Sequence, residues 1–182
     1  DGPKVMTGHD NGLVTIALVE ADDVERDKRR TAMGEPYRTL LGHFRHEIGH
    51  HYWDLLVRDG GKLEACRAVF GDDRQDYGEA LRRHYTDGPP RDWRESYVSA
   101  YATTHPWEDF AETWAHYLHI VDTLEMAHAF GVRVSPRLDD SGVLDADVDT
   151  DPYAAPDIGP IVADWLPLTF ALNSLNRCLG QR

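Results

Sequence analysis

The sequence predicts a mainly α-helical fold with a small β-sheet, in the α+β class. Two long segments, residues 35–59 and 106–130, repeat apolar side chains at three- and four-residue spacing, which is the period of an amphipathic helix. The clearest strand is residues 12–19, GLVTIALV, because this run is rich in Val, Ile and Thr. A chain of 182 residues can bury a sizeable core, so we expect one domain over residues 1–182.

The first long helix follows a charged segment, residues 21–35, that is expected to form a short helix or a turn. The helix is predicted to begin at Glu35-Pro36, because proline is tolerated in a first turn, and to end at Asp59-Gly60-Gly61. One stripe of the helix is apolar and is expected to face the core: Leu41, Phe44, Ile48 and Leu55. A different stripe is expected to face a functional site: His43, His46, His50, Trp53 and Val57.

Residues 46–50 of this helix read His-Glu-Ile-Gly-His, the pattern HExxH. Residues i and i+4 of a helix lie one turn apart on the same face, so His46 and His50 can direct a ring nitrogen at one metal ion. Glu47 can reach a water molecule on that metal without binding the metal itself. Two histidine ligands with a neighbouring general base are typical of zinc hydrolases. The alternative is a helix with incidental surface histidines.

Shorter elements are expected between the two long helices. Helices are predicted at residues 63–70, ended by Gly71, and at residues 76–85, ended before Gly88. The sequence Gly88-Pro89-Pro90 is a clear break, and residues 91–97 are expected to form one further helical turn.

The second long helix is predicted to run from Pro106 to about residue 130, where Gly131 ends it. It carries Glu108 and Glu112 one turn apart, and a catalytic zinc needs a third protein ligand. One of these carboxylates can bind zinc, while the other accepts a hydrogen bond from the far nitrogen of a ligating histidine. The alternative for this pair is a solvated helix face. Asp54, one turn past His50, is a weaker candidate for the third ligand.

A C-terminal helix is expected from an Asp157 cap to about residue 179, with a kink at Pro167. Before it, residues 139–151 are rich in aspartate, which raises the question of calcium. An EF-hand loop starting at Asp145 would place Thr150 and Pro156 where Gly and Glu are needed, so the segment is no EF-hand. A solvated acidic connector and an irregular calcium loop both remain open.

Composition narrows the classes of partner that the protein is expected to bind. The net charge is −13, with 32 acidic and 19 basic residues, and such a surface repels phosphate backbones. We therefore expect no nucleic-acid partner. The chain has no run of 18 apolar residues, so no membrane span is expected. Two cysteines suggest no disulfide scaffold and favour a cytoplasmic location, while the oligomeric state stays open.

The pattern HExxH followed by Glu108-Asp109-Phe110-Ala111-Glu112 resembles the gluzincin class of zinc peptidases. This resemblance implies that His46, His50 and Glu108 bind zinc and that Glu112 orients His46. The spacing from Tyr101 to Glu108 is also similar to that of the anthrax lethal factor group. In that group, a tyrosine seven residues before the ligand glutamate helps to stabilise the transition state. Other side chains are rivals for this role: Tyr97, His105 and His116.

At closer range, five runs spread over nearly the whole chain resemble a bacterial family known as putative zinc-binding metallopeptidases. The runs are GHDNGLVTIALVEADD, GHFRHEIGHHYWD, FGDDRQDYGEAL, HPWEDFAETWAHYLHIVDTLE and WLPLTFALNSLNR. The resemblance implies a zincin-like catalytic domain. Family members commonly carry a cysteine-rich zinc ribbon ahead of this domain, whereas here Cys66 and Cys178 form no CxxC pair. We therefore expect a fragment of a longer chain that lacks this ribbon.

Together these motifs predict a zinc-dependent metallopeptidase with a peptide or protein substrate. Glu47 is expected to act as the general base and Tyr101 to stabilise the oxyanion, with Zn²⁺ as the cofactor. The alternative is a non-catalytic, zinc-containing protein-interaction module. The intact Glu47 favours the enzyme, because a purely structural zinc has no use for a free carboxylate beside it.

Overall fold

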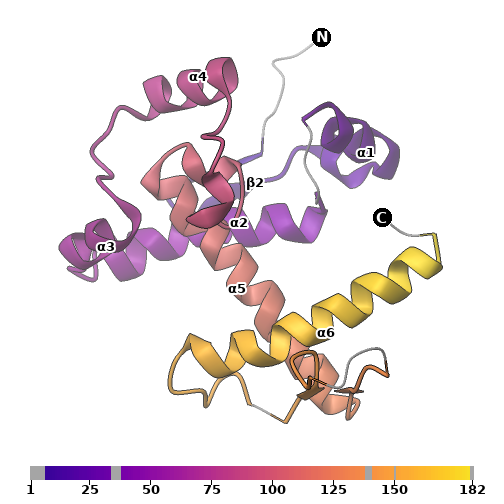
Figure 1. The fold of residues 1–182 in the computed structure, drawn as a ribbon. Helices are drawn as coiled ribbons and strands as arrows, with labels where there is room; N and C mark the ends of the chain where they lie inside the picture. Colours follow the sequence, from indigo (N-terminus) through magenta and orange to yellow (C-terminus); the bar gives the residue numbers. More distant parts are fainter. Residues whose placement is uncertain (1–6, 34–37, 138–140, 150, 181–182) are drawn as a thin grey trace. The chain divides into compact units, whose positions relative to one another are not determined.

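The computed structural model describes residues 7–33, 38–137, 141–149 and 151–180 (Figure 1). The predicted helix start at Glu35-Pro36 lies outside the described residues. The chain divides into two compact units, Asp1–His116 and Tyr117–Arg182. Helices dominate both units and the strands are short, which confirms the predicted α+β class. The single-domain organisation stays a prediction.

The first unit begins with a hairpin of strands β1 (Gly8–Asp10) and β2 (Leu13–Thr15), paired antiparallel. The predicted strand over residues 12–19 is thus shorter than expected. Pairing ends at Gly8 and Thr15, and beyond it the N–H of Ala17 donates to Thr7 Oγ1 at 3.1 Å. The chain then turns through the 3₁₀ helix η1 (Leu18–Ala21) into α1 (Asp23–Ala32).

The helices of the first unit follow the predicted order. They are α2 (Leu40–Trp53), the π-helical turn η2 (Asp54–Arg58), α3 (Leu63–Phe70), α4 (Tyr77–Asp87), the 3₁₀ turns η3 (Trp93–Glu95) and η4 (Tyr101–Thr103), and the start of α5 (Pro106–Ala129). Side-chain oxygens cap two of them. Thr39 Oγ1 accepts from Gly42 N–H at 2.9 Å at the start of α2, and Asp76 Oδ1 accepts from Glu79 N–H at 2.7 Å at the start of α4.

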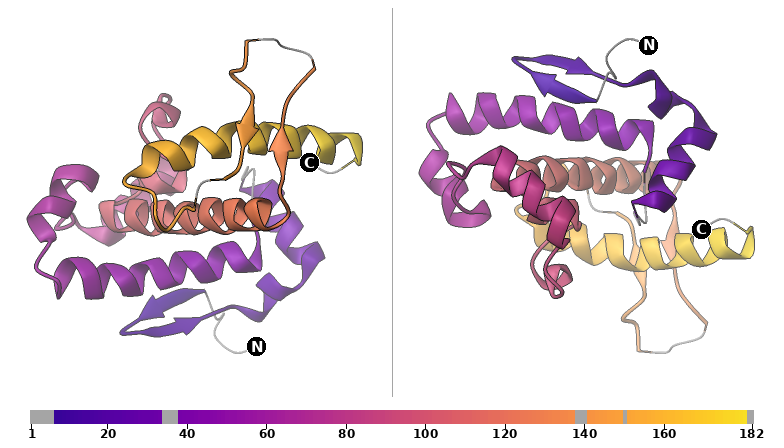
Figure 2. Two further views of the ribbon diagram at one scale, coloured as in Figure 1. Left: turned by 90° about the horizontal axis from the view of Figure 1, so that it is seen from below. Right: turned by 90° about the horizontal axis from the view of Figure 1, so that it is seen from above.

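The buried face of α2 differs from the predicted one. Leu41, Phe44 and Leu55 are 52%, 45% and 47% exposed, so their assignment to the core was wrong. The opposite stripe is buried, because the hairpin packs on one flank of α2 and the start of α5 on the other (Figure 2). Helices α2 and α5 approach closely at Gly49, where an added Cβ would lie 3.0 Å from Ala111 Cα. This close approach brings the face of α2 that carries His46 and His50 beside the face of α5 that carries Glu108.

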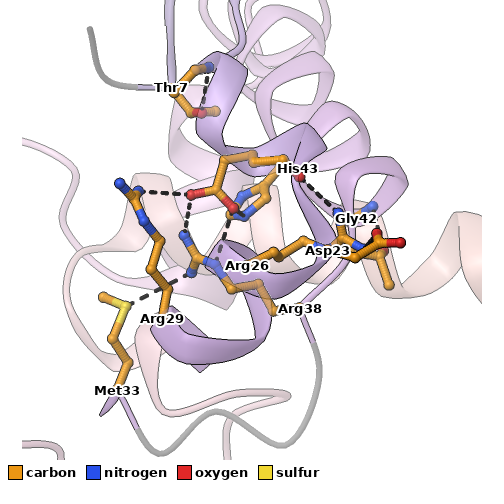
Figure 3. A network of polar contacts seen from close by, with 11 residues as sticks. Thr7, Asp23, Arg26, Arg29, Met33, Arg38, Gly42 and His43 are labelled. Carbon is orange, nitrogen blue, oxygen red and sulfur yellow. Dashed lines mark hydrogen bonds and ion pairs between the residues drawn. The ribbon is translucent and has the colours of Figure 1, made fainter. Parts of the chain in front are cut away.

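A buried carboxylate joins the N-terminal segment to α2 (Figure 3). Glu20 is 1% exposed, and its oxygens lie 2.9 Å from Arg29 Nη1, 2.8 Å from Arg38 Nη2 and 3.2 Å from His43 Nε2. Burial raises the pKa of Glu20, but Arg38, His43 and Arg29 outweigh it and hold this pKa below its ordinary value. The network therefore keeps an ionised glutamate inside the unit, in contact with His43, which lies one helical turn before His46.

The second unit contains the later part of α5, the antiparallel pair β3 (Arg133–Val134) and β4 (Ala146–Asp147), and α6 (Ile158–Cys178). Its core is formed by small and branched apolar side chains: Leu124, Ala127, Ala146, Val148, Ile161 and Leu168. Gly131 has φ +62°, so it can follow the end of α5, as predicted. Asp157 Oδ1 caps α6 by accepting from Gly159 N–H at 2.8 Å.

By length and composition, α6 is apolar enough to cross a membrane, a feature that the sequence expectation did not anticipate. A single helix of this kind is weak evidence, because core helices of soluble proteins pass the same test. Ile161 and Leu168 of α6 lie in the core of the second unit, but only 17% of the apolar window of this helix is buried. In the aspartate-rich segment, residues 139, 140 and 150 lie outside the described ranges, so both readings of that segment remain open.

Candidate metal centre

Helices α2 and α5 bring His46, His50 and Glu108 together in the first unit. His46 Nε2 lies 3.0 Å from His50 Nε2 and 3.0 Å from Glu108 Oε2, and His50 Nε2 lies 3.5 Å from the same oxygen. One ligand atom from each residue falls within 4.8 Å of the others. His50 and Glu108 are 3% and 2% exposed, so this cluster is shielded from solvent.

The chemistry of these atoms fits a bound metal ion. Glu108 Oε2 is buried and accepts no well-aligned hydrogen bond within the described part of the chain. Buried carboxylate oxygens are rarely left in this state, since the loss of solvation is costly. A cation surrounded by the two ring nitrogens and this oxygen would satisfy all three atoms. Two histidines and one carboxylate form a common protein ligand set of catalytic zinc, which leaves one coordination position open.

Without a metal ion, burial and the neighbouring charges shift the pKa values of the cluster residues in opposite directions. Burial lowers the pKa of His46, but Glu108 and Glu112 outweigh it and raise this pKa to about 10. Burial lowers the pKa of His50. Burial raises the pKa of Glu108, yet the two histidines outweigh it and hold this pKa below its ordinary value. A metal ion would take the place of the proton on His46, so binding releases a proton.

Glu112 lies behind His46. Its Oε1 is 2.7 Å from His46 Nδ1, and its Oε2 accepts a hydrogen bond from Ser99 Oγ at 2.6 Å. Ser99 Oγ in turn accepts from the N–H of Ala102 at 3.0 Å. A proton on Nδ1, shared with Glu112, leaves the lone pair of Nε2 directed at the cluster. Ser99 was not foreseen, because nothing in its local sequence marks it.

Glu47 is buried beside the cluster but is not one of its three members. It is 7% exposed, and burial raises its pKa to about 7. His46 lowers this pKa and Glu108 raises it, which places both charges within electrostatic reach of the Glu47 carboxylate. This is the position expected of a carboxylate that serves the site without binding the metal.

Two tyrosines border the cluster. The ring centroid of Tyr101, in η4, lies 6.0 Å from the ring centroid of His46. Burial raises the pKa of the Tyr101 hydroxyl. Tyr77, the first residue of α4, donates a hydrogen bond from its hydroxyl to Glu108 Oε1 at 2.6 Å. The sequence predictions did not include Tyr77. It lies 31 positions before its partner, so no local pattern could reveal the contact.

The residues considered as alternatives to Tyr101, or to Glu108 as the third ligand, lie elsewhere or make other contacts. His105 Nε2 lies 3.2 Å from the Gln75 carbonyl, and His116 Nδ1 lies 2.8 Å from the Glu112 carbonyl. Asp54 pairs with Arg58 at 2.7 Å and is no member of the cluster. Tyr97 is 37% exposed, and no contact of its side chain with the cluster is apparent among the described residues.

A cavity of about 320 Å³ adjoins the cluster. It is lined by Trp53, Asp54, Arg58, Asp73, Gln75, Tyr77, His105 and Trp107. Two of the lining residues contact the metal site. The ring centroid of Trp107 lies 3.8 Å from that of His50, and the Tyr77 hydroxyl donates a hydrogen bond to Glu108. The cavity thus lies next to the cluster, although none of the three cluster residues lines it.

Comparison with known proteins agrees with this geometry. A family model described as "Putative zinc-binding metallo-peptidase" matches residues 1–182. One protein of Mycobacterium bovis and two of Mycobacterium tuberculosis strains, each named as an uncharacterized protein, are 46% identical to this chain over 184 residues. The alignments cover 98% of this chain and 50% of each relative, so the chain spans about half the length of these relatives. No solved structure matches the chain.

Proposed function

The chain belongs to the family of putative zinc-binding metallo-peptidases, and from this premise we propose that it hydrolyses peptide bonds with a zinc ion held by His46, His50 and Glu108. The observation that carries the proposal is the convergence of these three ligand atoms next to a further carboxylate, Glu47, that is buried but does not join them. A structural zinc site is usually closed by four protein ligands. Three ligands with a spare carboxylate suit catalysis instead.

A bound zinc ion would act as a Lewis acid that polarises the peptide carbonyl and makes a water molecule more acidic. Glu47 accepts the proton of the attacking water and then donates it to the leaving amine. Glu112 and Ser99 hold His46 in the tautomer whose Nε2 lone pair faces the site. This division of roles is that of the gluzincin class, with Glu108 as ligand and Glu112 behind it.

Tyr101 is proposed to donate a hydrogen bond to the oxyanion that forms at the carbonyl oxygen. Its ring centroid lies 6.0 Å from that of His46, which places Tyr101 beside the metal-binding cluster. The adjoining cavity gives a substrate side chain a place beside the scissile bond. A peptide or protein substrate is therefore the class that this site accommodates best.

The test compares wild type with Glu47→Gln on a degenerate peptide library, analysed by mass spectrometry. Both proteins are loaded with zinc, and their metal content is measured beforehand, so that a loss of turnover is not confused with a loss of metal. Cleavage by wild type but not by Glu47→Gln is expected. Equal cleavage by both would remove Glu47 from the mechanism. If zinc binds to both and neither cleaves any peptide, the result counts against peptide hydrolysis by this chain and favours the non-catalytic interaction module.

A further inference from the structure

We propose that Tyr77 is a positioning residue that selects which oxygen of Glu108 faces the metal. The inference rests on the zinc-binding part of the proposed function. The Tyr77 hydroxyl donates to Glu108 Oε1 at 2.6 Å, while Glu108 Oε2 lies 3.0 Å from His46 Nε2 and 3.5 Å from His50 Nε2. The two oxygens of one carboxylate thus have separate partners. Tyr77 holds one oxygen, and the other is left for the metal.

The hydrogen bond from Tyr77 to Glu108 is strong because the carboxylate is buried. Glu108 is 2% exposed, so water cannot replace a lost partner on Oε1 at low cost. A hydroxyl that donates to a buried carboxylate at this distance forms a charge-assisted hydrogen bond, which is stronger than a neutral one. Without it, Oε1 is free to rotate toward the metal, and Glu108 would bind through both oxygens or in a shifted orientation.

The position of the Tyr77 ring is fixed independently of its hydroxyl. Asp76 caps the helix that Tyr77 begins, accepting from Glu79 N–H at 2.7 Å. The ring makes edge-to-face contacts with His105 and Trp107, at centroid distances of 5.5 and 5.8 Å. Removing only the hydroxyl therefore leaves the ring in place, which makes phenylalanine a clean substitution.

The experiment uses Tyr77→Phe, with Tyr153→Phe as the matched control. Tyr153 also donates its hydroxyl to a glutamate, Glu125, at 3.2 Å, but in the second unit. Zinc affinity is measured by competition with a chelator, and the absorption spectrum of the cobalt-substituted protein reports the ligand geometry. We expect Tyr77→Phe to bind zinc about 10- to 100-fold more weakly, the usual effect of removing a partner of a ligand. Its cobalt spectrum should also change, whereas Tyr153→Phe should match wild type in both measurements.

Unchanged zinc affinity and an unchanged cobalt spectrum in Tyr77→Phe would overturn the proposal. A crystal structure of the zinc-loaded wild type gives a second test that does not depend on the folding of a variant. It should show Glu108 bound through Oε2 alone, with the Tyr77 hydroxyl on Oε1; binding through both oxygens would contradict the inference. Wild type that binds no zinc would remove both the proposed function and this inference. If wild type binds zinc and Tyr77→Phe binds it equally well with the same cobalt spectrum, only the inference is removed.

Discussion

The close approach of α2 and α5 at Gly49 predicts that the substitution Gly49→Ala weakens zinc binding. The new Cβ would lie 3.0 Å from Ala111 Cα, 3.2 Å from Trp114 Cβ and 3.3 Å from the Ala111 carbonyl oxygen. Ordinary contacts begin at 3.4 Å, and two of these neighbours are backbone atoms that cannot rotate away. The helices must therefore separate by a few tenths of an ångström.

The expected magnitude comes from two opposing effects. Replacing glycine by alanine inside a helix normally stabilises it by about 1 kcal/mol. Overpacking a tight contact costs about 1–3 kcal/mol, so the net loss in the free energy of unfolding is about 0–2 kcal/mol. Zinc affinity should respond more clearly. Glu108 lies one turn before Ala111, and a ligand set tolerates displacements of only about 0.5 Å. We expect zinc to bind about tenfold more weakly.

The assay is chelator competition for zinc together with thermal unfolding of the zinc-free protein. Gly78→Ala is the matched control, because Gly78 also lies in a helix and its added Cβ would meet only Asp76 Oδ1, at an ordinary 3.5 Å. The control should keep the zinc affinity of wild type and unfold at the same temperature or slightly higher. If Gly49→Ala also binds zinc as wild type does and unfolds at a higher temperature, the inferred contact between the helices is wrong.

Three further outcomes are expected. Ser99→Ala, which removes the donor to Glu112 Oε2, should weaken zinc binding in chelator competition by up to about tenfold. Glu20→Gln should lower the free energy of unfolding at neutral pH, measured with urea. Because Arg38, His43 and Arg29 hold the pKa of Glu20 below its ordinary 4.5, the stabilisation is fully present above pH 4.5. It is lost as the pH falls through the folded-state value, so wild type and variant should converge in acid. Removal of zinc with a chelator should lower the unfolding temperature, since a ligand at 100 times its Kd stabilises the folded state by about 2.7 kcal/mol.

Local patterns in the sequence predicted the elements of the fold well. The helices at residues 63–70 and 106–129 occur almost as predicted, because caps, glycines and apolar periodicity act within a few residues. Periodicity did not reveal which stripe of α2 is covered. Leu41 and Phe44 are exposed, since the neighbouring hairpin and α5 pack on the other stripe. That choice depends on tertiary contacts, which a single helix does not encode.

The residues of the candidate site also fall into those that local spacing predicts and those that only tertiary contacts reveal. His46 and His50 follow from helical spacing alone, whereas the choice of Glu108 over Glu112 as the third ligand came from the resemblance to known zinc peptidases. The contacts of Ser99 and Tyr77 with the glutamates of α5 span 13 and 31 positions along the chain. No periodic signal links residues so far apart. The buried Glu20 was missed for a related reason, because the arginines that neutralise it come from separate segments.

The most direct test of the account is the zinc content of three proteins after dialysis against metal-free buffer: wild type, Glu108→Ala and Glu47→Gln. The account predicts one zinc ion per chain in wild type and in Glu47→Gln, because Glu47 lies beside the ligand cluster without joining it. Glu108→Ala should lose its zinc. Retention of zinc by Glu108→Ala, or its loss from Glu47→Gln, would contradict the assignment of the three ligands.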